Sequence, residues 1–305
     1  MPKTHDRDHF HKYVTGPVAV KILDALQVRW SSARLFNDPF DTQVDLRFDF
    51  SVKERNKRLE EEIEKLIFSE TEPIGDETKD NFIYFKKLWK DRANLDRTQL
   101  RRIIKSVIEE ETHRNTGEVF EACRESWGTF LSELKIFCVA EKHDNLLMWA
   151  HYSDSHMGAV IRFKCIPEED TALCAAIPVR YDNRLPYLDT VDSWVKRLIG
   201  LPYEFDSRQV FERYVCTKSS DWSYEKEWRV LVQRDHEDGE GVVLLSVLPA
   251  EIDAVYLGCK IPVTIRVEIA KRLTGPLQHV DLFQAKMNET HFALEFTLIS
   301  RGKRA

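Results

Sequence analysis

Hydrophobic and polar positions repeat with two different periods along the chain, and the change of period marks its organisation. Near the amino end, an extended segment over 11–15 is followed by apolar positions at helical spacing from Val18 to Leu26 and by a second extended segment over 27–32. Pro17 stands in the first turn of the predicted helix, where proline is favoured. The pattern therefore predicts a strand, a short helix and a strand in this order.

A long helical stretch follows over 52–134. Apolar side chains such as Phe82 and Ile104 recur there every three or four positions, while charged side chains of both signs fill the other faces. Mixed charges of this kind are typical of a solvated helix surface. We expect these residues to form a helical insertion between an N-terminal part of the core, 1–51, and its remainder, 135–305.

After the helical stretch, strand patterns return. The charged, glycine-containing segment over 235–241 predicts a turn, so that the strand ending near Gln233 and the strand over 242–247 form a hairpin. Together the elements predict an α+β fold with a mixed, largely antiparallel sheet and a helical insertion. The other extended segments of this part are expected over 136–140, 159–163, 177–181, 254–258, 280–285 and 292–299, and its helices near 146–152, 189–215 and 263–274.

Composition narrows the classes of function. The chain has 305 residues, 43% of them hydrophobic, and a formal net charge of -6, so nucleic acid could bind only through a local basic patch. No apolar run reaches membrane-spanning length and the polar start lacks a signal-like segment, so we expect a cytoplasmic protein without membrane contact. Six scattered cysteines argue against a zinc knuckle or a redox pair. Partners and oligomeric state stay open.

One aromatic and charged segment, Trp222–Arg229, leads directly into an apolar strand pattern. If the segment is extended, Glu225, Glu227 and Arg229 share one face, because side chains alternate along a strand. Buried charges are costly unless they are paired. The row is therefore either an ion-pair network that holds a sheet or the floor of a polar site, and the sequence favours neither.

Two further segments carry candidate polar groups. In the first, Phe36–Asp41, the side chains of Asn37, Asp38 and Asp41 can each bond nearby backbone amides, so the segment is either a structural turn or a site loop. In the second, His151 and His156 stand five positions apart at a helix-to-loop boundary. Two histidines without a ligand cluster favour core or turn roles, so no metal site is predicted from them.

Several common catalytic patterns are absent from the sequence. The 11 glycines never gather into a phosphate loop or a dinucleotide fingerprint. There is no Gly-x-Ser-x-Gly elbow and no His-Glu-x-x-His helix, which excludes the usual hydrolase and zinc-protease signatures.

Three segments together resemble a known bacterial family. Phe36–Asp41, then Met148–Tyr152 with His156 and Gly158, then Lys218 with Trp222–Arg229 are similar, in order and spacing, to the family called domain of unknown function 2971. The resemblance implies a shared fold and a set of shared residues without an activity. The charged helical stretch is where such proteins differ, so chemistry is not expected there.

One interpretation is a transferase that uses NAD as co-substrate, of the defence or toxin-effector type. Glu225-Lys226-Glu227 resembles the Glu-x-Glu element of ADP-ribosyltransferases, and the opening strand, helix and strand are similar in order to the start of that fold. In this hypothesis Glu227 stabilises an oxocarbenium-like ribose and Glu225 orients the acceptor. Tyr13 or Tyr152 would stack on the ligand.

Two other interpretations remain. A metal-dependent nuclease would hold its ion with Asp38, Asp41 and the two glutamates, with Lys218 steadying developing charge. A non-catalytic partner-binding protein would instead use the charges and aromatic rings as structure, and its helical stretch would recognise the partner. The full set of candidate substrate-binding residues is Tyr13, Asn37, Asp38, Asp41, Trp149, His151, Tyr152, His156, Lys218, Tyr224 and Arg229.

Overall fold

The computed structural model describes residues 3–114, 118–234 and 241–303, without the side chains of residues 97, 107 and 109–123. Its first elements are β1 (His9–Val14), α1 (Gly16–Ala25) and β2 (Gln27–Ser31), in the order that the sequence pattern predicts. Pro17 lies in the first turn of α1, and Leu26 follows the helix with a left-handed φ of 51°. This reversal leads the chain directly from α1 into β2.

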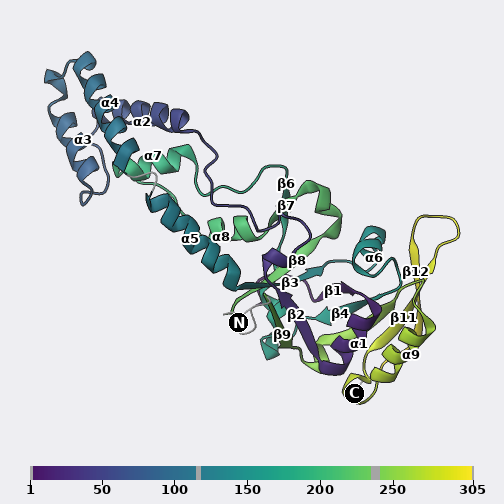
Figure 1. The fold of residues 1–305 in the computed structure, drawn as a ribbon. Helices are drawn as coiled ribbons and strands as arrows, with labels where there is room; N and C mark the ends of the chain where they lie inside the picture. The colour runs from purple at the N-terminus through teal and green to yellow at the C-terminus, as the bar shows by residue number, and fades with distance from the viewer. Residues whose placement is uncertain (1–2, 115–117, 235–240, 304–305) are drawn as a thin grey trace. The chain divides into compact units, whose positions relative to one another are not determined.

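A large mixed sheet organises one part of the molecule (Figure 1). Within the described residues its strands follow the order β12-β11-β10-β4-β1-β3-β2-β9, and β8 pairs with both β3 and β5. The β10–β11 pair is parallel and the other pairs are antiparallel, which confirms the predicted α+β class. The remaining strands of this sheet are β3 (Leu134–Ala140), β4 (Ala159–Lys164), β5 (Ile177–Pro178), β8 (Glu227–Gln233), β9 (Val242–Ser246), β10 (Ile252–Leu257), β11 (Asp281–Met287) and β12 (Leu294–Ser300).

The predicted hairpin between the strands at 227–233 and 242–246 is wrong. β8 pairs along β3 from Gln233 to Glu227, whereas β9 pairs along β2. The turn residues 235–240 lie outside the described residues. A local turn pattern shows where the chain changes direction, but it does not show which strands pair. Here β3 pairs with β8 and β2 pairs with β9, so β8 and β9 do not pair with each other.

Helices cover the two faces of the sheet. α1 and α9 (Val263–Arg272) pack on the face that carries Phe10 and Ile161. α6 (Leu146–Tyr152) packs on the opposite face, through Trp149 against Tyr13. Because side chains alternate along β1, neighbouring residues of this strand serve the two hydrophobic clusters.

The chain divides into two compact units. The core unit comprises residues 1–43, 130–184 and 216–305, and the helical unit comprises residues 44–129 and 185–215. The sequence pattern placed 185–215 with the core, because these residues follow several strands in the chain. None of the helices that the structure describes combines the length and the apolar character needed to cross a membrane.

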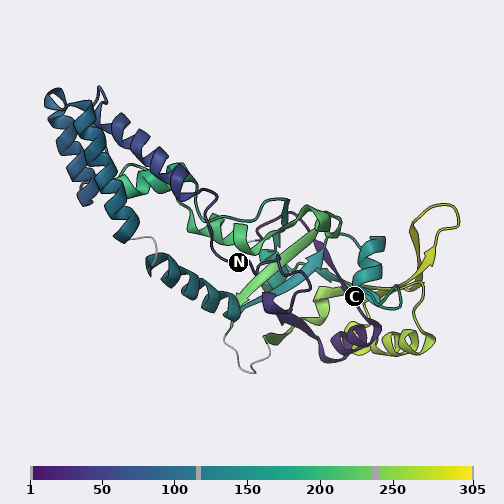
Figure 2. The same ribbon diagram turned by 45° about the horizontal axis from the view of Figure 1, so that its top comes forward.

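The helical unit has a hydrophobic core of its own. Ile63, Phe85 and Ile104 are fully or almost fully buried in it, on the apolar stripes that the 3.6-residue period predicts. Figures 1 and 2 show α2, α3 and α4 lying side by side. Its helices are α2 (Val52–Ile67), α3 (Asp80–Lys90), α4 (Arg97–Arg114), α7 (Val191–Ile199), α8 (Ser207–Val215) and most of α5 (Glu118–Glu133).

Candidate functional site

A short parallel strand pair in the core unit positions the first of the predicted site residues. β7 (Thr217–Ser219) pairs with β6 (Arg180–Asp182), and the side chain of Lys218 at its centre is buried. Lys218 Nζ also lies 4.8 Å from the centroid of the Trp222 ring. The ammonium group is therefore held in a largely dry environment.

The segment after β7 is not extended, so the alternation of side chains considered for an extended row does not apply to it. Ser219 accepts a hydrogen bond from the Asp221 amide and starts a 3-10 turn over Ser220–Glu225. Lys226 follows with a left-handed φ of 46°, and β8 begins only at Glu227. The charged row is therefore extended only from Glu227 onwards, because a side-chain cap competes with strand pairing before it.

The structure nevertheless brings the charged residues together. Asp41 arrives from the turn at 36–41, in which the Asp38 carboxylate accepts the Phe40 amide at 2.9 Å. We call the assembled group the charged cluster, and each of its side chains belongs to a residue between 0% and 7% exposed. Its members are Asp41, Lys218, Glu225, Glu227 and Arg229.

Arg229 is the fully buried centre of the cluster. Its Nη2 lies 2.7 Å from Asp41 Oδ2, and its Nε lies 2.8 Å from Glu227 Oε1. Its Nη1 donates to the Thr42 hydroxyl at 2.8 Å. The planar guanidinium thus joins the turn before the helical unit to strand β8, which is a use that suits arginine better than lysine.

Lys218 is the second cation of the cluster. Its Nζ lies 2.6 Å from Glu225 Oε2, 3.2 Å from Glu227 Oε2 and 3.6 Å from Asp41 Oδ2. Three carboxylates therefore face two permanent cations, which leaves one formal negative charge within the cluster. Charge-assisted hydrogen bonds of this kind are among the stronger ones in proteins.

Every carboxylate oxygen of the cluster has a hydrogen-bond donor. Besides the contacts to Lys218 and Arg229, Tyr152 donates to Glu225 Oε1 at 2.6 Å and Thr42 donates to Asp41 Oδ1 at 3.0 Å. The Glu227 amide donates to the Tyr181 hydroxyl at 2.8 Å. The sequence analysis did not single out Thr42 or Tyr181. Thr42 could have been suggested only by its position next to Asp41, and Tyr181 only by its position in the strand expected over 177–181.

The cluster shifts the pKa values of its members in opposite directions. Burial acts to raise the pKa of Glu227, but Arg229 and Lys218 outweigh it and hold this pKa well below its ordinary range. Burial raises the pKa of Glu225, and Lys218 opposes the shift. Burial acts to lower the pKa of Lys218, yet the surrounding carboxylates keep it raised. These directions describe a network whose charges stabilise one another.

Other predicted site residues lie outside the cluster. Tyr13 donates its hydroxyl hydrogen to the Lys142 carbonyl at 2.8 Å, and its ring meets Trp149 edge-on at 5.6 Å. Trp149 is fully buried and donates to the His143 carbonyl at 2.7 Å. Asn37 and His151 are exposed. The three segments therefore meet only in part, through Asp41, Tyr152 and the residues from Lys218 to Arg229.

His156 and Tyr224 each contact α6, since the His156 ring stacks on Trp149 and the Tyr224 ring lies 6.4 Å from that of His151. The Tyr224 carbonyl accepts a hydrogen bond from Asn145, whose side-chain oxygen also caps α6. Asp154, Ser155 and His156 all have positive φ values, of 48°, 52° and 70°. Such backbone is rare for residues other than glycine and costs energy that the surrounding packing must balance.

A metal site is not evident among the described residues. They contain no group of three or more His, Cys, Asp or Glu side chains placed to hold an ion. The carboxylates proposed for a nuclease are instead arranged around Lys218 and Arg229, apart from Asp38, which serves its own turn.

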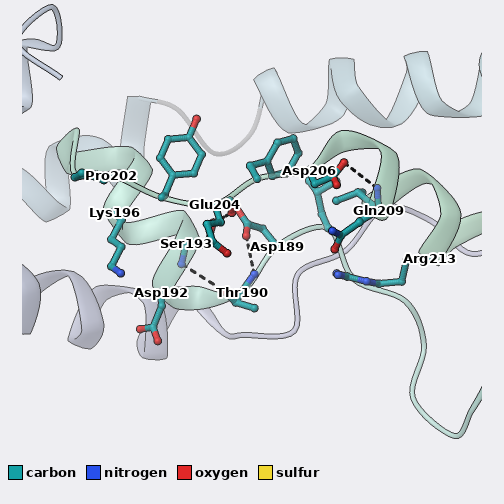
Figure 3. A pocket seen from close by; sticks show the side chains of 14 residues that line it. Asp189, Thr190, Asp192, Ser193, Lys196, Pro202, Glu204, Asp206, Gln209 and Arg213 are labelled. Atoms are coloured by element: carbon teal, nitrogen blue, oxygen red, sulfur yellow. Dashed lines mark hydrogen bonds between the residues drawn. The ribbon is translucent and has the colours of Figure 1, made fainter. Parts of the chain in front are cut away.

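A large open cavity lies elsewhere, within the helical unit. Figure 3 shows it between α7 and α8 and the loop that joins them, and its volume is about 900 Å³. Polar and charged side chains such as Asp189, Lys196 and Glu204 line it. The sequence analysis placed no candidate residue in this segment.

Comparison with known proteins adds one finding. No curated protein and no solved structure matches the chain. A family model matches one segment of the chain, and this segment contains four members of the charged cluster together with α7, α8 and the cavity. Residues 148–230 of this chain match the model of a family described as Protein of unknown function (DUF2971).

Proposed function

We propose that this chain is a non-catalytic binding protein, in which the charged cluster maintains the core unit and the helical unit receives the ligand. One observation carries the proposal. Each carboxylate oxygen of Asp41, Glu225 and Glu227 already accepts a hydrogen bond or ion pair, in residues at most 7% exposed. Groups held in this way serve packing, because a ligand would have to displace a buried cation to reach them.

The transferase hypothesis makes a demand that this arrangement does not favour. A carboxylate that stabilises a ribose cation must approach the ligand closely. Glu227 contacts Arg229 and Lys218, and Glu225 contacts Lys218 and Tyr152. Releasing either glutamate would break a charge-assisted hydrogen bond to a buried cation, which typically costs about 1.5–3 kcal/mol. The metal-dependent nuclease meets the same obstacle, since three of its four ligands would come from the same cluster.

The helical unit offers what a binding role requires. Its cavity of about 900 Å³ lies at the upper end of the range for ligand sites. Exposed aromatic side chains, Tyr203 and Phe205, stand beside ionisable ones along its wall. Its lining combines these rings with charged groups of both signs, which suits a polar ligand.

A stability and turnover experiment tests the structural role of the cluster. We expect Glu227→Gln to lower the free energy of unfolding by about 1.5–3 kcal/mol, because the amide nitrogen of glutamine cannot accept the hydrogen bond that one Glu227 oxygen accepts from Arg229 or Lys218. Urea unfolding followed by circular dichroism measures this change. Glu268→Gln is the matched control in the same unit, where Glu268 forms exposed pairs with Lys271 and Arg272, and its midpoint should stay nearly unchanged.

The same variants are incubated with NAD and nucleic acid or protein acceptors. The wild-type chain should release no nicotinamide above the level of a heat-denatured sample. Nicotinamide release that Glu227→Gln abolishes, while its unfolding midpoint matches the wild type, would overturn the proposal and favour the transferase.

A further inference from the structure

The last strand of the large sheet leaves one of its edges unpaired. β12 lies at one end of the strand order and, among the strands that the structure describes, it pairs only with β11. Figures 1 and 2 show the hairpin of these two strands in yellow, with its tip clear of α6 and α9. The strand at the opposite end of the order, β9, is shorter. The β12 edge is therefore the longer of the two edges that end the sheet.

The direction of the backbone groups along β12 follows from its register with β11. The Asn288 amide donates to the Ala293 carbonyl at 3.0 Å, and the register places these two residues opposite each other. Hydrogen-bonded and non-hydrogen-bonded pairs alternate along an antiparallel ladder. The N–H and C=O groups of Leu294, Phe296 and Leu298 therefore point away from β11. No strand that the structure describes lies on that side, so this row of donors and acceptors is open to another strand.

β12 lacks most of the features that prevent edge strands from pairing. Natural edge strands are usually very short, or they carry proline or several charges. β12 has 7 residues and no proline, and its only charged residue is Glu295. Leu298 and Ile299 are 36% and 41% exposed. An edge of this length and composition is expected to pair with another strand.

An antiparallel copy of β12 matches this edge in one register. If Phe296 lies opposite Phe296 of the second copy, the outward groups of Leu294 meet those of Leu298, so the open donors and acceptors satisfy one another. On one face, leucine then lies beside leucine and phenylalanine beside phenylalanine, next to the aromatic cluster that Leu294 and Phe296 already join. On the other face, Glu295 lies beside Thr297. No like charges face each other within the paired strands.

The two ends of this segment are also complementary in charge. The chain after β12 carries Arg301 and Lys303, whereas the hairpin tip before it carries Glu289. All three are exposed, and within the described part of the chain none of them forms an ion pair. Because the strands of the two copies run in opposite directions, the basic end of each copy lies beside the acidic tip of the other. Opposite charges arranged in this way favour one partner and fix the register.

We propose that the β12 edge pairs with the same edge of a second copy of this chain, across a two-fold axis at Phe296, and so joins two sheets into one. A two-fold contact uses the same patch on both copies and closes after two. Pairing of β12 with β9 of another copy would instead build open filaments. An extended peptide of another protein would need to reproduce the same apolar row and end charges.

Sedimentation velocity of the full-length chain, measured from low to high micromolar concentration, tests this proposal. We expect a reversible equilibrium between monomer and dimer. Leu298→Pro removes the outward N–H of this residue without breaking a hydrogen bond to β11, a position at which an edge strand tolerates proline. The symmetric dimer would lose that bond twice, so its dissociation constant should rise by at least about tenfold.

Leu298→Val is the matched control. It keeps the backbone amide and an apolar side chain, so it should dimerise like the wild type. The urea unfolding midpoint of each variant shows whether its fold is intact.

A charge exchange at the exposed ends tests the register and does not depend on whether Leu298→Pro folds. Lys303→Glu would set two acidic groups beside each other and should weaken the dimer by about threefold or more. Adding Glu289→Lys to this variant restores the opposite charges, so the double variant should dimerise like the wild type.

The proposal is overturned if the chain sediments as a monomer at every concentration or grows beyond a dimer. It is equally overturned if a folded Leu298→Pro dimerises as tightly as the wild type, or if the charge exchange has no effect. None of these results affects the structural role of the charged cluster, which the unfolding of Glu227→Gln tests.

Discussion

At the scale of single residues, buried charges in this protein differ in how many hydrogen bonds they make. Arg229 is fully buried, yet two carboxylates and a hydroxyl accept from it. Asp189 is nearly as buried, yet one of its oxygens accepts no hydrogen bond from the described residues. The first arrangement satisfies every donor of a buried charge, whereas the second leaves one buried oxygen with only an ion pair to Arg197 at 4.0 Å.

A neutral buried histidine gives the core unit a dependence on pH. His11 is 8% exposed, and burial, with the nearby charges of His143 and Arg162, lowers its pKa from 6.5 to about 3. Between about pH 3 and 6.5, His11 is therefore protonated in the unfolded chain and neutral in the folded chain. The contribution of His11 to the free energy of unfolding is fully present above about pH 6.5 and declines as the pH falls towards 3. His11 alone contributes a slope of up to about 1.4 kcal/mol per pH unit.

Urea unfolding at intervals from pH 7.5 to 4.5 measures this slope. We expect His11→Phe to show a flatter decline than the wild type, because it removes the group that protonates on unfolding. His291→Phe serves as the control, since His291 is exposed, and its slope should match the wild type. Identical slopes for His11→Phe and the wild type would show that His11 is not the titrating group.

At the scale of elements, close backbone contacts fix how α6 leads into β4. A Cβ atom added at Gly158 would lie 2.1 Å from the Val14 carbonyl oxygen, and one added at Gly258 would lie 2.1 Å from the His156 carbonyl oxygen. The left-handed residues from Asp154 to His156 stand between these contacts and α6. The sharp return before β4 thus depends on glycine because two backbones meet there.

Two glycine substitutions should change stability in opposite directions. Gly158→Ala is expected to lower the free energy of unfolding by about 1–3 kcal/mol, because the Val14 backbone must move. Gly128→Ala, in α5 with nothing within 4 Å of the added Cβ, should raise it by about 0.5–1 kcal/mol through a better helix propensity. Chemical denaturation measures both. A stabilising Gly158→Ala would contradict the tight approach of β1 to the turn.

At the scale of the whole molecule, two hydrophobic cores support two units. Ile161 is fully buried in the core unit and Ile104 is fully buried in the helical unit. The main chain passes between the units near residues 43, 129, 184 and 215. Compact units with separate cores are expected to respond to damage individually.

Cavity-forming substitutions in each core test this expectation. Ile104→Ala should cost about 2–5 kcal/mol and accelerate amide exchange in α2 and α4, while the amides of β1 and β4 stay protected. Ile161→Ala should give the reverse pattern. Hydrogen exchange read by mass spectrometry measures both, and faster exchange throughout the chain in either variant would indicate a single cooperative unit.

The sequence by itself determined most elements of this protein. Hydrophobic period located most helices and strands, as with the helix expected near 146–152 that the structure shows as α6, because propensity and periodicity act over a few residues. The same patterns predicted the α+β class. The sequence also singled out Asp41 in one segment and Glu225 and Arg229 in another as candidate polar residues.

Only the tertiary structure decided how those residues are used. Arg229 pairs with Asp41, 188 positions away, and β8 pairs with β3 rather than β9. Residues 185–215 join the helical unit, where Asp189 forms an ion pair with Arg197 at 4.0 Å. Burial and pairing are properties of chain segments that meet after folding, so a one-dimensional pattern shows that charges exist without showing which of them find partners.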